Sequence, residues 1–118
     1  MGTFKHSITL IAQARGDTET LNAVVDTGAT FTVVPAPILE HLGVRPQRKL
    51  RLRLANGEVV EWDLGEVVAQ LNGVTATILC ILAEPDAPSL IGAHTLEASL
   101  VMMEPIEQRL VPTEGLLL

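Results

Sequence analysis

The chain has 118 residues, a hydrophobic fraction of 47% and a formal net charge of −6. That length suits one domain rather than two, and the apolar content is enough for a packed core and argues against disorder. An acidic chain without an obvious basic patch argues against a nucleic-acid partner. We therefore expect residues 1–118 to form one folded domain that binds no nucleic acid.

Short β-rich runs separated by turn signals follow one another along the chain, which is typical of an all-β domain. The turn signals are residues 15–18, Asn56-Gly57 and Asn72-Gly73, of which Asn-Gly is a strong hairpin signal. Short helices are predicted over residues 35–42 and 92–98. The predicted strands cover residues 4–14, 21–25, 31–34, 50–54, 58–70, 74–83, 89–91 and 100–103, with 109–112 as a further edge strand.

The N-terminal segment and the single cysteine give information about the cellular compartment of the protein. The first six residues lack a basic segment followed by an apolar one, and no apolar run approaches the roughly 20 residues of a membrane helix. We therefore expect a cytoplasmic protein with no membrane partner, although a chain trimmed of a leader or anchor would look the same. Cys80 lies in the apolar run Ile78–Leu82, which indicates a buried thiol.

The segment Asp26-Thr-Gly28 directly follows an apolar predicted strand. A carboxylate that activates water must be held at a fixed angle in a place of low dielectric constant. The strand supplies a rigid approach, and Gly28 lets the chain turn so that backbone amides come close to the carboxylate. Such amides hydrogen-bond the charged form and orient it. The motif therefore makes Asp26 a candidate catalytic acid.

Two segments together resemble the aspartic protease family. Its hallmark is a pair of apolar residues, then Asp-Thr/Ser-Gly-Ala/Ser, and later an apolar-apolar-Gly segment, which Val24–Thr30 and Leu90-Ile-Gly92 reproduce at a similar spacing. Pepsin-like enzymes carry this set twice, whereas retropepsins carry it once and form the second copy by dimerisation. This chain has one copy. The resemblance implies a small closed acid-protease barrel, all-β with one short C-terminal helix, that acts as a homodimer.

The resemblance also implies a mechanism. Two Asp26 carboxyls within about 3 Å cannot both ionise, for which the aspartic-protease dyad is the standard example. One then serves as general acid and the other as general base for a water that attacks a peptide bond. Thr27 would reach across the twofold axis, and Gly28 completes the catalytic segment. This chemistry needs a polypeptide substrate and no metal, cofactor or covalent intermediate.

The hairpin over residues 50–64 lies where the family places its mobile flap. An extended peptide would bind by strand addition between flap and barrel, with its side chains in alternating pockets. Trp62 on the return strand either covers a subsite or packs as a structural residue. The resemblance implies a flap tip of Leu54, Ala55, Asn56, Gly57 and Glu58, and pocket walls that include Ala29, Thr30, Val34 and Ile91.

Thr30 and Ala93 occupy the positions where retroviral proteases often pair an acid with an arginine. The departure favours a cellular or bacterial relative over a viral enzyme. Two other hypotheses stay open: a non-catalytic module of the same fold that binds peptides or dimerises, and an unrelated β barrel with a chance motif. The basic residues between Arg45 and Arg53 favour a solvated strand face over a nucleic-acid site, and the histidines lack metal-ligand spacing.

Overall fold

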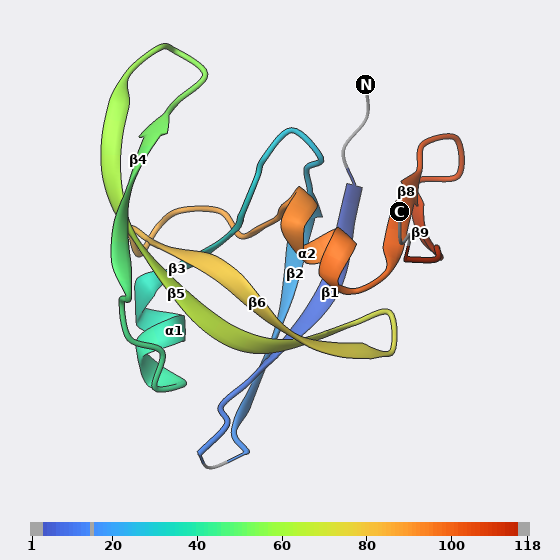
Figure 1. Cartoon of the computed structure of the whole chain (residues 1–118), viewed down its shortest axis with the longest axis horizontal. Helices are drawn as coiled ribbons and strands as arrows, with labels where there is room; N and C mark the ends of the chain where they lie inside the picture. Colours follow the sequence, from blue (N-terminus) through green and yellow to red (C-terminus); the bar gives the residue numbers. More distant parts are fainter. Residues whose placement is uncertain (1–3, 15, 116–118) are drawn as a thin grey trace.

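The computed structural model describes residues 4–14 and 16–115, which form a closed β barrel with two short helices (Figure 1). The barrel is a seven-stranded sheet in the order β1-β2-β7-β3-β6-β5-β4, and β1 also pairs with β5 to close it. The strands are β1 (Phe4–Ile11), β2 (Thr18–Val25), β3 (Thr32–Pro35), β4 (Arg48–Arg53), β5 (Val59–Leu71), β6 (Val74–Ala83) and β7 (Leu90–Ile91), and the helices are α1 (Ala36–His41) and α2 (Ala93–Ala98). The predicted all-β barrel with a short helix near the C-terminus is confirmed.

The hairpin turns lie where the sequence predicts them. Asn72 and Gly73 connect β5 to β6 with φ of +53° and +83°, the backbone conformation of the tight turns that suit a hairpin. β1 and β2 pair antiparallel around a turn in which the Ala12 amide donates to the Asp17 carbonyl at 2.7 Å. Arg15 of this predicted turn lies outside the described residues. β1 ends and β2 begins three residues earlier than expected.

The short strand β7 lies between β2 and β3 and brings two distant segments together. It runs parallel to β2, with Val25 opposite Ile91, and antiparallel to β3, with Val33 opposite Leu90. The end of β2 and the residues after β7 therefore meet at one point of the barrel, although they are far apart in the sequence. This crossing positions the candidate site.

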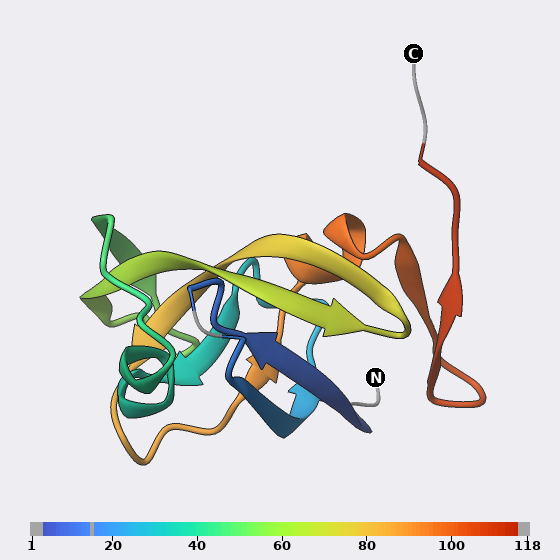
Figure 2. The same ribbon diagram turned by 90° about the horizontal axis from the view of Figure 1, so that it is seen from below.

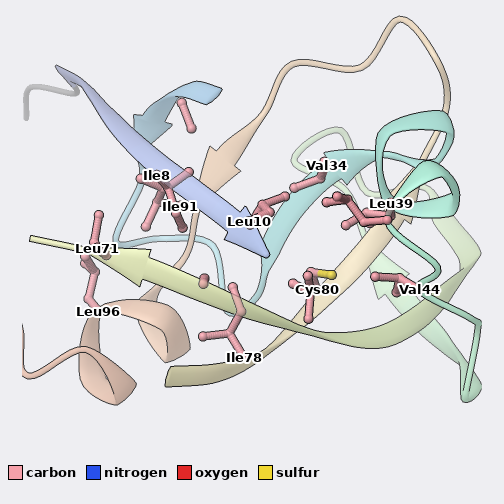
Figure 3. Packing of buried hydrophobic residues seen from close by; sticks show 14 of the residues in the cluster. Ile8, Leu10, Val34, Leu39, Val44, Leu71, Ile78, Cys80, Ile91 and Leu96 are labelled. Carbon is pink, nitrogen blue, oxygen red and sulfur yellow. The ribbon is translucent and has the colours of Figure 1, made fainter. Parts of the chain in front are cut away.

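Aliphatic side chains fill the barrel, as the low aromatic content requires (Figure 3). Ile8, Leu10 and Leu39 are at most 1% exposed, and burying each such side chain is worth about 1.5–3 kcal/mol. Cys80 lies in the same cluster with no exposed surface, so the predicted buried thiol is confirmed. Desolvation raises the pKa of this thiol to about 12.

The C-terminal part of the described chain forms a separate hairpin, β8 (Val101–Glu104) and β9 (Arg109–Pro112), which stands beside the barrel (Figure 2). The predicted strands are present, and β9 pairs with β8 rather than with the barrel. One face of the hairpin adds Val101 and Leu110 to the core. Leu100, Met102 and Ile106 are exposed by 45%, 53% and 89%. No helix in the described part of the chain is long and apolar enough to cross a membrane.

Candidate active site

Backbone hydrogen bonds hold the loop that carries Asp26. The Asp26 amide donates to the Ile91 carbonyl at 3.0 Å, and the Ala29 amide donates to the Asp26 carbonyl at 3.1 Å. The Gly28 amide donates to Asp26 Oδ1 at 3.0 Å. This hydrogen bond fixes the orientation of the Asp26 carboxyl group relative to the loop. The side chain of Asp26 is partly buried at the end of β2.

Gly92 packs directly against the same loop. A Cβ atom at this position would lie 2.5 Å from the backbone C and O of Phe31 and 2.9 Å from the Ala29 carbonyl oxygen. The next two amides, of Ala93 and His94, donate to the carbonyls of Ala29 and Thr30 at 2.8 and 3.0 Å. Only glycine allows this approach, which explains why the apolar-apolar-Gly segment must end in Gly92.

Two buried threonines stabilise the contact between the Asp26 loop and Gly92. Neither of them was predicted from the sequence. Thr32 and Thr95 are at most 1% exposed. The Gly92 amide donates to Thr32 Oγ1 at 3.1 Å, and this hydroxyl lies 2.5 Å from Thr95 Oγ1. A possible signal was Thr32 inside the apolar run Phe31–Val34, since a hydroxyl in a buried strand needs a partner.

The β4–β5 hairpin forms a flap on the side of the barrel where the Asp26 loop emerges (Figure 1). Its tip, residues 54–58, is held by local contacts. The Leu54 amide donates to the Glu58 carbonyl at 2.8 Å, and the Gly57 amide donates to the Leu54 carbonyl at 2.9 Å. The Glu58 amide donates to Asn56 Oδ1 at 2.9 Å, and the Arg53 guanidinium donates to the Gly57 carbonyl at 3.1 Å.

A groove of about 430 Å³ separates the flap from the Asp26 loop. Of the described residues that line it, Asp26 alone carries a carboxylate and Arg53 alone a cation. A hollow of about 490 Å³ around residues 42–47 contains no residue of the loop or the flap tip. The groove is lined by Asp26, Gly28, Ala29, Thr30, Phe31, Val33, Leu52, Arg53, Leu54, Ala55, Trp62, Ile81, Ala87, Pro88 and Leu90.

The structure brings six of the predicted site residues together on this groove. Thr27 is exposed in the Asp26 loop, and three more of the predicted residues lie at the exposed flap tip without lining the groove. The residues on the groove are Asp26, Gly28, Ala29, Thr30, Leu54 and Ala55, and those of the tip beyond it are Asn56, Gly57 and Glu58.

Ile91 and Val34 require a correction, because neither lies in a pocket wall. Ile91 has no exposed surface and Val34 is 1% exposed, and both belong to the barrel core (Figure 3). Neighbouring residues of a strand point to opposite faces, so Leu90 and Val33 line the groove instead. Trp62 packs in a cluster of apolar side chains and also lines the groove, so both alternatives for this residue stay open.

The retropepsin-like aspartic proteases share this architecture. It is a closed β barrel in which an Asp-Thr-Gly loop packs against a later glycine beneath a β-hairpin flap. The family model of the gag-polyprotein putative aspartyl protease matches residues 12–98, more than half of the chain. The chain belongs to this family. No curated protein matches this chain.

Solved structures show the same fold at low sequence identity. The simian foamy virus (mac) protease is 20% identical, with a TM-score of 0.57 over 79% of this chain and 91% of that one. The EIAV protease in complex with the inhibitor HBY-793 is 18% identical, with a TM-score of 0.60 and 93% of each chain covered. The retroviral protease-like domain of Ddi1 from Leishmania major is 16% identical, with a TM-score of 0.58 over 95% and 89%.

Proposed function

We propose that this chain, as a single domain, is one half of a homodimeric aspartic endopeptidase in which two Asp26 carboxyls activate a water molecule. The observation that carries the proposal is the placement of Asp26. Its carboxylate accepts the Gly28 amide at 3.0 Å and lines a groove beneath a flap. The groove is otherwise largely apolar, which suits a peptide and strengthens electrostatic interactions once water is excluded.

A second copy of the chain supplies what one groove lacks. Peptide hydrolysis by this route needs a general base and a general acid, and Asp26 is the single carboxylate among the described groove residues. A twofold axis beside the Asp26 loop places two identical carboxyls together. One proton is then shared between them, so one carboxyl acts as the general acid and the other as the general base. Thr27, which is exposed, would contact the partner at this axis.

The reaction proceeds through a gem-diol. The ionised Asp26 takes a proton from water as the oxygen bonds to the peptide carbonyl carbon, and the protonated Asp26 of the partner subunit donates its proton to the carbonyl oxygen, which gives the gem-diol. The first Asp26, now protonated, gives its proton to the amide nitrogen as the C–N bond breaks, and a hydroxyl of the gem-diol returns a proton to the Asp26 of the partner subunit as the carboxylic acid forms. The flap holds the peptide as an added strand and excludes water from the groove.

The β8–β9 hairpin offers an apolar surface for the second copy. Three of the four large apolar side chains that are exposed in the described chain lie on this hairpin or directly before it, namely Leu100, Met102 and Ile106, and the fourth is Val59. Exposed apolar groups that cluster on one element are typical of an interaction surface. The incomplete acid pair makes a second copy the partner that this surface fits, so the hairpin would add area to the contact at the axis.

The first experiment compares wild type with Asp26→Asn on a mixed peptide library at mildly acidic pH, with products identified by mass spectrometry. We expect wild type to cleave between apolar residues and Asp26→Asn to be inactive, while both remain dimers. Asp86→Asn is the matched control, because Asp86 is exposed and does not line the groove. Equal cleavage by wild type and Asp26→Asn would refute the role of Asp26.

Sedimentation velocity tests the dimer. We expect a concentration-dependent dimer for wild type and a weaker one for Met102→Asp, because a charge on the hairpin face must be desolvated at the contact. A wild type that is strictly monomeric at all concentrations would contradict the proposal. The alternative, a peptide-binding or dimerisation module of the same fold, predicts a dimer that binds peptides and cleaves none.

A further inference from the structure

Two of the three aromatic side chains in this chain line the same groove. The sequence contains Phe4, Phe31 and Trp62 and no tyrosine. Phe31 and Trp62 come from different elements, the loop before β3 and the strand β5, and both border the groove beneath the flap. A chain that is only 3% aromatic therefore concentrates its aromatic surface at the candidate site.

The register of the flap places Trp62 on its inner face. Trp62 lies opposite Leu50 in the β4–β5 pairing. Its neighbours Glu61 and Asp63 point to the other face, because side chains alternate along a strand, and Asp63 bonds there to Lys49 at 3.1 Å. The indole therefore faces the groove with the apolar side chains of the flap.

The rest of the described groove lining is mainly apolar, and its one cation, on Arg53, is bound by the flap tip. Arg53 pairs with Val59 on the outer face of the flap, and its guanidinium is bound to the Gly57 carbonyl. Six other side chains belong both to the apolar cluster of Trp62 and to the lining of the groove, and they are Phe31, Val33, Leu52, Ile81, Ala87 and Leu90. A substrate side chain that enters beside Trp62 meets this apolar cluster, whereas the polar lining of the groove comes from Asp26, Thr30 and Arg53.

We propose that Trp62 is a specificity-determining residue, the principal wall of a subsite that accepts an aromatic side chain of the substrate peptide. The proposal rests on the proposed function, since it names the kind of peptide that the groove selects. Aromatic rings bury a large apolar area and pair favourably with other rings in stacked or edge-to-face geometry. Trp62 and Phe31 provide two such partners, so a phenylalanine gains contacts here that an alanine or a charged residue lacks.

The first test reads binding without catalysis. Trp62 is the only tryptophan, so the intrinsic fluorescence of the protein reports on this subsite directly. The Asp26→Asn variant is titrated with two labelled peptides that differ by phenylalanine or alanine at one position, and peptide anisotropy measures binding independently. We expect the phenylalanine peptide to bind roughly tenfold more tightly and to shift the emission. Tight binding of that peptide with unchanged emission would overturn the proposal.

The second test measures selectivity as the ratio of kcat/KM for the two peptides. We expect Trp62→Ala and Trp62→Leu to lower this ratio roughly tenfold and Trp62→Phe to retain most of it. Phe4→Ala is the control, because Phe4 packs on the core and does not line the groove. A purely structural Trp62 would lower both kcat/KM values and leave their ratio unchanged, which would refute the proposal.

The two tests separate this inference from the proposed function. If wild type cleaves no peptide while the emission of Trp62 still responds to the phenylalanine peptide, the protease assignment fails and the subsite stands. If wild type cleaves peptides with no preference for an aromatic residue, the protease assignment stands and the subsite fails.

Discussion

The Asp26 loop and the flap tip face each other across one groove, yet they are held in opposite ways. The Asp26 loop is bound by Ile91, Gly92 and the residues of α2, all distant in sequence. The tip at residues 54–58 is bound by its own neighbours between Arg53 and Glu58. The loop therefore belongs to the barrel, whereas the tip is a local structure at the end of a hairpin.

The glycines show the same contrast. A Cβ at Gly92 would lie 2.5 Å from the backbone of Phe31, whereas a Cβ at Gly57 would meet no atom within 4 Å. Gly57 is needed for its φ of +90° and not for space. Segments with few buried contacts open at lower free energy than the core, so we expect the tip to move and the loop to stay fixed, which is what the proposed function requires of a flap over Asp26.

Gly92→Ala is expected to have the largest effect on stability. The added methyl group overlaps the backbone of Phe31, and the surrounding backbone cannot yield without breaking the loop. We expect the free energy of unfolding to fall by about 3 kcal/mol, measured by urea denaturation at a fixed protein concentration. A loss no larger than that of Gly57→Ala would contradict the contrast between the two regions.

Thr32→Val removes the hydroxyl that joins Gly92 to Thr95 while keeping the size of the side chain. It leaves a buried amide and a buried hydroxyl without this partner, so we expect the free energy of unfolding to fall by about 2 kcal/mol. Thr9→Val is the matched control, since Thr9 pairs with Thr20 at 2.9 Å at an exposed position of β1 and β2. Equal losses in the two variants would show that burial of the pair is unimportant.

Gly57→Ala tests the flap tip. A left-handed backbone costs an L-residue about 1–2 kcal/mol, and no neighbouring atom adds to that cost. We expect a loss within this range in urea denaturation. Gly73→Ala is the comparison, since Gly73 has a similar positive φ and equally open space in the β5–β6 turn. A much larger loss at Gly57 alone would mean that the tip carries tertiary contacts.

The sequence predicts the Asp26 loop well because its determinants are local residue types. An acid after an apolar strand, a glycine two residues later and a second glycine after Leu90-Ile91 can all be recognised in the sequence alone. The flap follows from strict alternation in residues 50–54 and from Asn56-Gly57. That same alternation, continued through the return strand, places Trp62 on the inner face.

The sequence does not predict which residues of the short strands β3 and β7 face the core. Val33-Val34 and Leu90-Ile91 are each a pair of adjacent apolar residues, so either member could face the core. The position of β7 between β2 and β3 decides which residue of each pair faces the core, and that position depends on pairings between distant segments. The hydrogen bond between Thr32 and Thr95 could not be predicted for the same reason. It joins distant segments, and nothing in the sequence around either threonine points to the other.

The smallest expected effect on stability concerns Cys80. It tests whether the barrel behind the Asp26 loop is rigid, because Cys80 lies opposite Thr32 in the pairing of β3 with β6. Burial raises the pKa of its thiol from 9.0 to about 12. The unfolded thiol therefore ionises first, and the contribution of Cys80 to stability is complete below pH 9 and is lost as the pH rises toward 12. Between pH 8 and pH 10 we expect the free energy of unfolding to fall by about 1 kcal/mol more in wild type than in Cys80→Ala. Parallel pH profiles for the two proteins would mean that the thiol exchanges with solvent in the folded state, and that the region behind Asp26 is less fixed than the buried contacts of Thr32 indicate.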